Sequence, residues 1–410
     1  MEQKKIIFSP PDISEAEIEE VCATLRSGWL TTGPRTKELE RKIAAYVGTS
    51  KAVALNSATA AEELNLRILG IGAGDEVLVP AYTYTASAAA AIHVGATVRF
   101  IDVQKDCLEM DYEQMEAAIT EKTKAVIPVD IAGIPCDYDR IYEIVERKKA
   151  LFTPGGNTDL GQRIQKALGR VAVVSDSAHS FGASRKGVMA GSLADFSSFS
   201  FHAVKNFTTA EGGAAVWKDI PGIDNEEMYR WYQLYSLHGQ SKDALAKDQL
   251  GSWEYDIIAP LYKCNMTDVA AAIGLKQMDR YPALLERRKQ IIAMYDACCD
   301  ELGVEHLTHD TAEYASSRHL YLSRIPWADD ALRREVIVKM AERGVPTNVH
   351  YKPLPMMTAY KNLGFDIKDF PNAYAHYANE VTLPLHTKLS DEDVEFITNN
   401  YREVILSVKP

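Results

Sequence analysis

The chain has 410 residues, of which 46% are hydrophobic and 25% charged, a composition typical of globular proteins and long enough for two or three domains. Its net charge of −12 argues against a nucleic-acid-binding surface and against binding to anionic lipid. The first residues lack the apolar core of a signal peptide, and no apolar run approaches the roughly 20 residues of a membrane span. The six cysteines have no metal-type spacing. We therefore expect a cytoplasmic protein with reduced cysteines and no metal.

Strands alternate with helices along most of the chain, which predicts a doubly wound, mainly parallel sheet. The first helix is expected from Ser14 to Ser27, with Ser14 and Glu17 as a capping pair and an apolar face formed by Ile18, Val21, Cys22 and Leu25. Further helices are expected at 36–47, in the alanine-rich stretch that ends at His93, at 284–302 and at 390–408. Strands are expected at 52–55, 76–80, 97–102, 125–129, 171–174, 196–201 and 214–217.

Lys205 has an unusual setting, because no charged residue lies within five positions of it. Small, hydroxyl and aromatic neighbours desolvate an ammonium group and lower its pKa, so a neutral amine becomes available as a nucleophile. The hydroxyls of Ser200, Thr208 and Thr209 and the glycine pair at 212–213 suit a nearby phosphate. A reactive lysine beside a phosphate site indicates pyridoxal phosphate (PLP) bound as a Schiff base. The alternative is a buried strand and turn whose lysine extends to solvent.

A second stretch favours the cofactor. The apolar run at 171–174 is typical of a buried parallel strand, and Asp176 follows at or just past its carboxyl end. A carboxylate at this position can keep a pyridine nitrogen protonated, which makes the ring an electron sink.

These stretches, Asp-Ser-Ala-His-Ser-Phe-Gly-Ala at 176–183 and Ser-Phe-His-Ala-Val-Lys-Asn-Phe-Thr-Thr-Ala-Glu-Gly-Gly at 200–213, resemble the DegT/DnrJ/EryC1/StrS family of sugar aminotransferases. The resemblance extends from Gly-Trp-Leu-Thr-Thr-Gly-Pro at 28–34 to Leu-Pro-Leu-His at 383–386. It implies an α/β fold of the PLP-dependent transferase type I, with a mainly parallel seven-stranded sheet in a large domain at 1–280 and a smaller α/β domain at 281–410. An apparent insertion at 148–169 is assigned no chemistry.

The resemblance also implies cofactor contacts. Lys205 would hold PLP as an internal aldimine and act as general base and acid, and pyridoxamine phosphate would form in the half-cycle. Asp176 would keep the ring nitrogen protonated. His179 would contact the ring hydroxyl. Ser57, Ala58 and Thr59 would cradle the phosphate together with Ser200, although the family usually has glycine where this chain has Ala58. Tyr84 would stack on the ring, whereas an aromatic residue is otherwise more often part of a core.

Other contacts are expected at the substrate and between subunits. Thr31, Thr32, His350 and Tyr351 match family positions that face the substrate. Lys263 and Asn265 match positions that a partner subunit supplies to the neighbouring phosphate, so we expect a homodimer with shared active sites. The family commonly has asparagine where this chain has Lys263, and arginine where it has Asn265. No role is assigned to Asp130 or His238.

The expected function is transfer of an amino group from L-glutamate to a nucleotide-linked keto-sugar, a UDP- or dTDP-4-keto-6-deoxyhexose, in surface glycan or deoxyamino-sugar synthesis. Two alternatives remain open: a PLP- or pyridoxamine-dependent sugar 3-dehydratase, and a non-catalytic PLP-binding regulatory protein. The lysine at 205 argues against the dehydratases that carry histidine there, and no DNA-binding segment supports the regulator.

Overall fold

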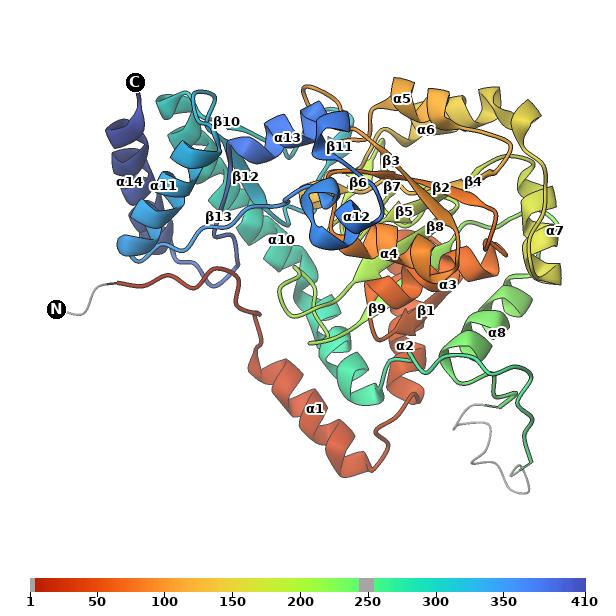
Figure 1. Ribbon diagram of the computed structural model, residues 1–410. Coiled ribbons are helices and arrows are strands. Elements are labelled where there is room, and N and C mark those ends of the chain that lie inside the picture. Colours follow the sequence, from red (N-terminus) through yellow and green to blue (C-terminus); the bar gives the residue numbers. More distant parts are fainter. Residues whose placement is uncertain (1–3, 243–253) are drawn as a thin grey trace.

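A seven-stranded sheet forms the centre of the molecule. The computed structural model describes residues 4–242 and 254–410, and its large sheet has the order β1-β9-β8-β5-β4-β2-β3 (Figure 1). Only β9 runs against its neighbours, because it pairs antiparallel with both β1 and β8 while the remaining pairs are parallel. The predicted mainly parallel sheet is therefore confirmed. Its strands are β1 (Ala52–Leu55), β2 (Glu76–Pro80), β3 (Thr97–Ile101), β4 (Thr123–Val126), β5 (Ala172–Asp176), β8 (Phe196–Ser200) and β9 (Gly213–Trp217).

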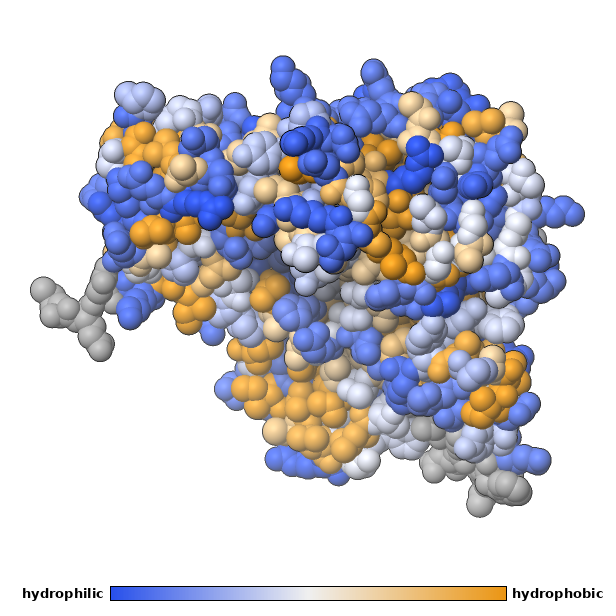
Figure 2. Space-filling model, in the orientation of Figure 1, coloured by the Kyte–Doolittle hydropathy of each residue, from blue (hydrophilic) through white to orange (hydrophobic). Residues whose placement is uncertain are grey.

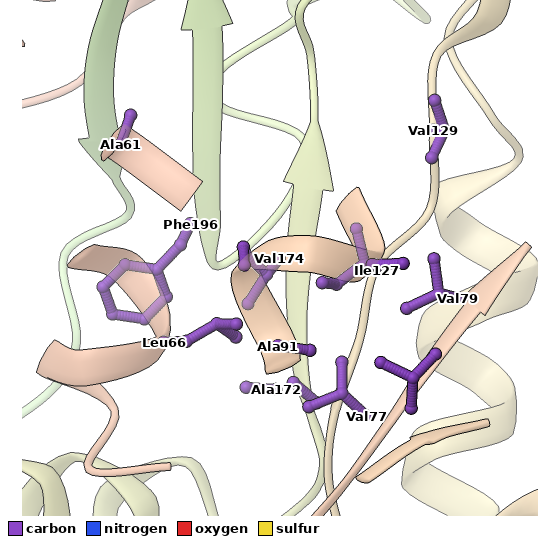
Figure 3. Packing of buried hydrophobic residues seen from close by; sticks show 14 of the residues in the cluster. Ala61, Leu66, Val77, Val79, Ala91, Ile127, Val129, Ala172, Val174 and Phe196 are labelled. Carbon is purple, nitrogen blue, oxygen red and sulfur yellow. The ribbon is translucent and has the colours of Figure 1, made fainter. Parts of the chain in front are cut away.

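Helices cover both faces of this sheet. Side chains alternate along each strand, so Val77 and Val79 of β2 contribute to one core cluster while Leu78 contributes to another. Figure 3 shows the first cluster, in which Val77, Val79 and Val174 point toward residues of the covering helices. That face is covered by α3 (Ala58–Ile68), α4 (Thr85–His93), α7 (Asp159–Leu168) and α8 (Asn225–Ser236). The other face is covered by α2 (Pro34–Val47), α5 (Tyr112–Ala118), α6 (Tyr138–Arg147) and α10 (Asp268–Leu302).

A second core cluster lies toward the C-terminus. It contains Ile6 together with buried side chains from residue 291 to residue 405. The predicted division between residues 280 and 281 falls inside α10 and stays a prediction. The elements around this cluster and along the rest of the C-terminal half are β10 (Glu305–His306), β12 (Tyr321–Arg324), β13 (Glu380–Leu383), α11 (Asp330–Glu342), α12 (Thr358–Asn362), α13 (Pro371–Ala378) and α14 (Asp391–Val408). Another small sheet joins β11 (Tyr314–Ala315), β6 (Ser184–Arg185) and β7 (Val188–Met189). The short 3₁₀ turns are η1 (Ile131–Gly133), η2 (Lys149–Leu151), η3 (Leu354–Met356) and η4 (Ile367–Asp369).

The start of α10 differs from the prediction by 16 residues, since the helix begins at Asp268 instead of residue 284. Pro282 lies inside the helix, where proline removes a backbone hydrogen bond and normally interrupts helical structure. Packing against α1 and α2 holds this part of α10 in place. Tertiary contacts therefore override the local signal.

Helix α1 (Glu15–Ser27) begins where the sequence predicts, but its predicted apolar face packs only partly inside the chain, since Val21 and Cys22 are half-buried. Ile18 is 46% exposed and Leu25 is 54% exposed. The residues that α1 buries are Glu17 and Thr24, because the Glu17 carboxylate accepts hydrogen bonds from Gln277 (2.8 Å) and Arg280 (2.7 Å) of α10. Ile18 and Leu25 are left at the surface of this chain.

The remaining sequence expectations concern membranes and cysteines. Within the described ranges, no helix has the length and apolarity needed to cross a membrane. All six cysteines are free thiols.

Candidate active site

A cavity of about 400 Å³ opens at the carboxyl edge of the large sheet. Because β1, β2, β5 and β8 run in the same direction, the loops that follow them meet at this edge. The predicted residues that line the cavity are Ser57, Ala58, Thr59, Tyr84, Asp176, His179, Ser200, Lys205, His350 and Tyr351.

One end of the cavity is suited to an anion. Ser57 caps α3, and its hydroxyl accepts a hydrogen bond from the Ala60 N–H over 3.1 Å. The N–H groups of Ala58 and Thr59 lie in the first turn of this helix, where backbone donors have no partner within the helix. Gly213 lets the neighbouring strand approach, since a Cβ there would lie 2.5 Å from the Ala58 nitrogen. Backbone donors and the helix dipole together favour a phosphate at this position.

Asp176 ends β5 and is almost fully buried. Its Oδ2 accepts a hydrogen bond from the Ser87 hydroxyl (2.7 Å), and its Oδ1 accepts one from the Ala178 N–H (3.1 Å). Burial raises the pKa of Asp176, while these two hydrogen bonds and the Lys205 charge oppose that shift. A buried carboxyl of this kind gains most from a cationic partner such as a protonated pyridine nitrogen.

The Lys205 amine borders the same cavity. Burial lowers the pKa of Lys205 to about 8, although the Asp176 charge acts in the opposite direction. A substantial fraction of the amine is therefore neutral near physiological pH, as a Schiff-base nucleophile and proton-transfer group requires.

His179 is neutral and its tautomer is fixed by the fold. Its Nδ1 accepts a hydrogen bond from the Ala132 N–H over 3.2 Å, which leaves the ring proton on Nε2, 3.0 Å from the Tyr351 hydroxyl. Burial, with a contribution from Lys205, lowers the pKa of His179 well below its usual value. Ala132 adopts a left-handed conformation (φ 58°), which turns its N–H toward the histidine. His179 can thus donate to an oxygen such as the ring hydroxyl.

His350 and Tyr351 reach the cavity from the loop after α11. The His350 Nδ1 lies 2.9 Å from the Thr382 hydroxyl, and the His350 N–H donates to Glu380 over 2.9 Å. Burial lowers the pKa of His350 to about 4 and raises the pKa of Glu380 to about 8. These contacts hold the histidine ring against the cavity.

Tyr84 is not part of a core. The residue is 60% exposed, and its ring lies 5.9 Å from the Tyr351 ring, measured between centroids. An exposed aromatic ring on a cavity wall is suited to stacking on a flat ligand.

Four predicted residues do not line this cavity in the single chain. Thr31 is exposed, and Thr32 is buried, where its hydroxyl donates to the Met266 carbonyl (2.6 Å). Asn265 donates to the Thr32 hydroxyl (2.5 Å), and its side-chain oxygen accepts from Lys263. The roles of Thr31 and Thr32 at the substrate, and of Lys263 and Asn265 at a partner subunit's phosphate site, therefore stay predictions.

Asp130, to which the sequence assigns no role, organises the loops below the site. Its carboxylate accepts hydrogen bonds from Cys136 N–H (3.0 Å), the Tyr138 hydroxyl (2.9 Å) and the Ser180 hydroxyl (2.6 Å). Burial raises the pKa of Asp130 to about 6. Since Ser180 follows His179 directly, these bonds help to place the histidine.

Sequence reasoning missed several residues at the site. Glu62, His202 and Glu211 also border the cavity, and Ser87 contacts Asp176 from α4. His202 and Glu211 lie in the stretch already singled out, so the positions on either side of Lys205 could have indicated them. Glu62 and Ser87 lie inside helices, where no local pattern distinguishes a side chain that faces the sheet edge.

The donor set fits pyridoxal phosphate: backbone N–H groups for the phosphate, a buried carboxylate for the ring nitrogen and an activated lysine for the aldehyde carbon. The sheet and this site define a PLP-dependent transferase of fold type I. Among such enzymes, the chain belongs to the DegT/DnrJ/EryC1/StrS aminotransferase family, whose sequence model matches residues 11–153 and 161–402. The unmatched internal residues, 154–160, lie within the predicted insertion.

Several relatives support this assignment. The chain is 56% identical to the putative sugar aminotransferase Spr1654 from Streptococcus pneumoniae in its PLP form, with a TM-score of 0.94 and coverage of 99% of this chain and all of that one. It is 36% identical to the spore coat polysaccharide biosynthesis protein SpsC from Bacillus subtilis over 99% of both chains. It is 25% identical to PseC from Helicobacter pylori, an aminotransferase involved in the biosynthesis of pseudoaminic acid, with a TM-score of 0.85 over 98% of this chain and all of that one.

Proposed function

We propose that this sugar aminotransferase moves an amino group from L-glutamate to a nucleotide-linked keto-sugar, a UDP- or dTDP-4-keto-6-deoxyhexose. The observation that carries the proposal is the pairing, in one cavity, of the activated amine of Lys205 with the buried carboxylate of Asp176. The relatives named for polysaccharide and pseudoaminic acid biosynthesis support a role in making surface glycans. The cytoplasmic location expected from the sequence stays a prediction.

The residues divide the work of binding and proton transfer. Pyridoxal phosphate, when bound, supplies an electron sink for the electron pair released at the donor carbon. Lys205 Nζ would move a proton between the donor carbon and the cofactor carbon, in opposite directions for donor and acceptor. Asp176 keeps the ring nitrogen protonated, and His179 Nε2–H donates to the ring oxygen. The Ala58 and Thr59 N–H groups and Ser200 hold the phosphate.

The substrate would enter between Tyr84 and the loop that carries His350 and Tyr351. The neutral His350 and the Tyr351 hydroxyl can exchange hydrogen bonds with sugar hydroxyls without adding charge beside Lys205.

A homodimer forms part of the proposal. Figure 2 shows a hydrophobic area over α1, which matches the exposed side chains of Ile18, Leu25 and, just beyond the helix, Leu30. Monomeric proteins rarely leave such contiguous apolar surface in water. In such a dimer the exposed Lys263 would be the cation supplied to the neighbouring phosphate site.

The test is a half-reaction. PLP and then L-glutamate are added to the purified protein while visible absorption and 2-oxoglutarate release are followed. Loss of the bound-cofactor band with one equivalent of 2-oxoglutarate per site is expected, and L-alanine serves as the comparison donor. A band that does not respond to glutamate would refute glutamate as the donor. A panel of UDP- and dTDP-linked 4-keto-6-deoxyhexoses would then test the acceptor by restoring the band.

A further inference from the structure

Glu62 is a buried acid that the mechanism above does not use. It lies one turn into α3, has no exposed surface, and borders the cofactor cavity. Neither of its carboxyl oxygens has a hydrogen-bond partner among the described residues. A fully buried carboxyl group without a partner is costly, so its presence beside the cavity calls for a partner that appears when the site is filled.

Asn65, on the next turn of the same helix, has a matching unsatisfied group. It is fully buried, its Oδ1 accepts a hydrogen bond from the Tyr232 hydroxyl (2.6 Å), and its Nδ2 has no partner in the described part of the chain. Residues three apart on a helix are neighbours on its surface. An unpaired donor therefore lies next to the unpaired acceptors of Glu62.

The charges around Glu62 favour its neutral form. Burial raises the pKa of Glu62 well above its usual value, and the Asp176 charge raises it further. Asp176 from β5 is the charged group that acts on it from the facing strands, while on its own helix Glu63 pairs with Arg67 (2.8 Å) away from it. Two buried carboxyl groups that repel each other favour the state in which one of them keeps its proton.

We propose that Glu62 is a positioning residue for the pyridine end of the cofactor, linking Asn65 to Asp176 as a neutral carboxylic acid. The directions of donation agree along this series of four hydrogen-bonded side chains. Tyr232 O–H donates to Asn65 Oδ1, Asn65 Nδ2–H donates to the Glu62 carbonyl oxygen, and Glu62 O–H donates to the Asp176 carboxylate. Since the structure shows neither of the last two links as a direct hydrogen bond, each passes through one bound water. Asp176 then faces the ring nitrogen as a single negative charge, oriented by Glu62 as well as by Ser87. This inference rests on the proposed role of Asp176.

The test uses Glu62→Gln, Glu62→Leu and the control Glu63→Gln, which makes the same acid-to-amide change one position along the helix. The amide of Glu62→Gln can accept from Asn65 and donate to Asp176, so its cofactor dissociation constant and the pH midpoint of its visible band should match those of the wild type. Glu62→Leu interrupts this series of hydrogen bonds and should weaken cofactor binding about tenfold, which corresponds to the loss of one hydrogen bond to a charged group. Its cofactor-free form should melt no lower than the wild type, because leucine replaces an unpartnered acid. Glu63→Gln should leave both cofactor measurements unchanged.

Three outcomes would overturn the proposal. A pH midpoint lowered by a full unit in Glu62→Gln would mean that Glu62 is ionised. Wild-type cofactor affinity in Glu62→Leu would mean that the series of hydrogen bonds through Glu62 does not influence the cofactor. A lowered melting temperature of cofactor-free Glu62→Leu, with affinity falling in parallel, would indicate a packing role only. Failure of the wild-type protein to form a cofactor band would instead refute the proposed function itself.

Discussion

The Ser87 hydroxyl donates a hydrogen bond of 2.7 Å to Oδ2 of Asp176, joining the first turn of α4 to the end of β5. Ser87 is fully buried, so this bond is shielded from water and fixes one carboxylate oxygen. Among the described residues, the remaining oxygen, Oδ1, accepts only the Ala178 N–H, over 3.1 Å. The carboxylate is therefore oriented before any cofactor binds.

Replacing the carboxylate tests its role. Asp176→Asn should still bind PLP but lose at least roughly a hundredfold in turnover, because an amide cannot keep the ring nitrogen protonated. Ser87→Ala should keep the charge and lose about five- to tenfold, since only one orienting hydrogen bond is removed. Steady-state turnover and cofactor affinity separate the two effects. Wild-type turnover in Asp176→Asn would contradict the electron-sink assignment.

Lys205 should carry the covalent link to the cofactor. After reduction with borohydride, the wild-type chain should gain the mass of one pyridoxyl phosphate, located by peptide mass spectrometry at Lys205. Lys205→Ala should show neither this mass nor any transamination. The exposed Lys186, paired with Asp139 (2.6 Å), provides the control: Lys186→Ala should be modified and active like the wild type. Modification at another lysine would refute the assignment.

Mixed dimers test whether two chains build one site. Lys263→Ala should weaken PLP retention, because the partner's phosphate loses a cation. A mixture of Lys263→Ala and Lys205→Ala chains should recover part of the activity, since one of the two sites in a mixed dimer receives both native lysines. Differently tagged chains, co-purified and assayed, provide the measurement. Absence of any recovery in verified mixed dimers would argue against shared sites.

The activated lysine should reduce the stability of the cofactor-free protein in a pH-dependent way. Burial lowers the pKa of Lys205 to about 8, whereas a lysine in the unfolded chain titrates near 10.4. Between these values the unfolded chain binds the proton more readily, so the free energy of unfolding falls as the pH decreases from about 10 to 8.

Lys205→Met removes this effect. At pH 7 it should raise the free energy of unfolding by at most about 3 kcal/mol, and the gain should shrink to below about 1 kcal/mol by pH 10. Urea denaturation of the cofactor-free proteins across this pH range measures the difference. A gain that stays constant with pH would show that the pKa of Lys205 is not lowered in the folded state.

Much of the site was predictable because it lies in loops that directly follow strands. Residues that follow the carboxyl ends of strands running in one direction must meet at one edge of a sheet. Asp176, Lys205, Ser57 and Tyr84 all satisfy this condition, and the structure brings them around a single cavity.

Positions inside helices could not be predicted in the same way. Glu62 and Asn65 are polar residues in α3, where charge normally indicates a solvated face, and only the packing of α3 against the sheet buries them. The start of α10 was also missed, because the local signal of Pro282 is opposed by contacts distant in sequence. The apolar pattern of α1 was recognised, but a sequence does not state whether such a face packs within its own chain.

The placement of Ile6 has a consequence for how the protein is made. Its N–H donates to the Gly344 carbonyl (2.9 Å), its side chain packs with residues from 291 to 405, and the next carbonyl, of Ile7, accepts from His386 (2.9 Å). Residues translated early thus find their neighbours only after most of the chain has left the ribosome. The large sheet can assemble first, while this segment docks as one of the last steps and closes the C-terminal cluster.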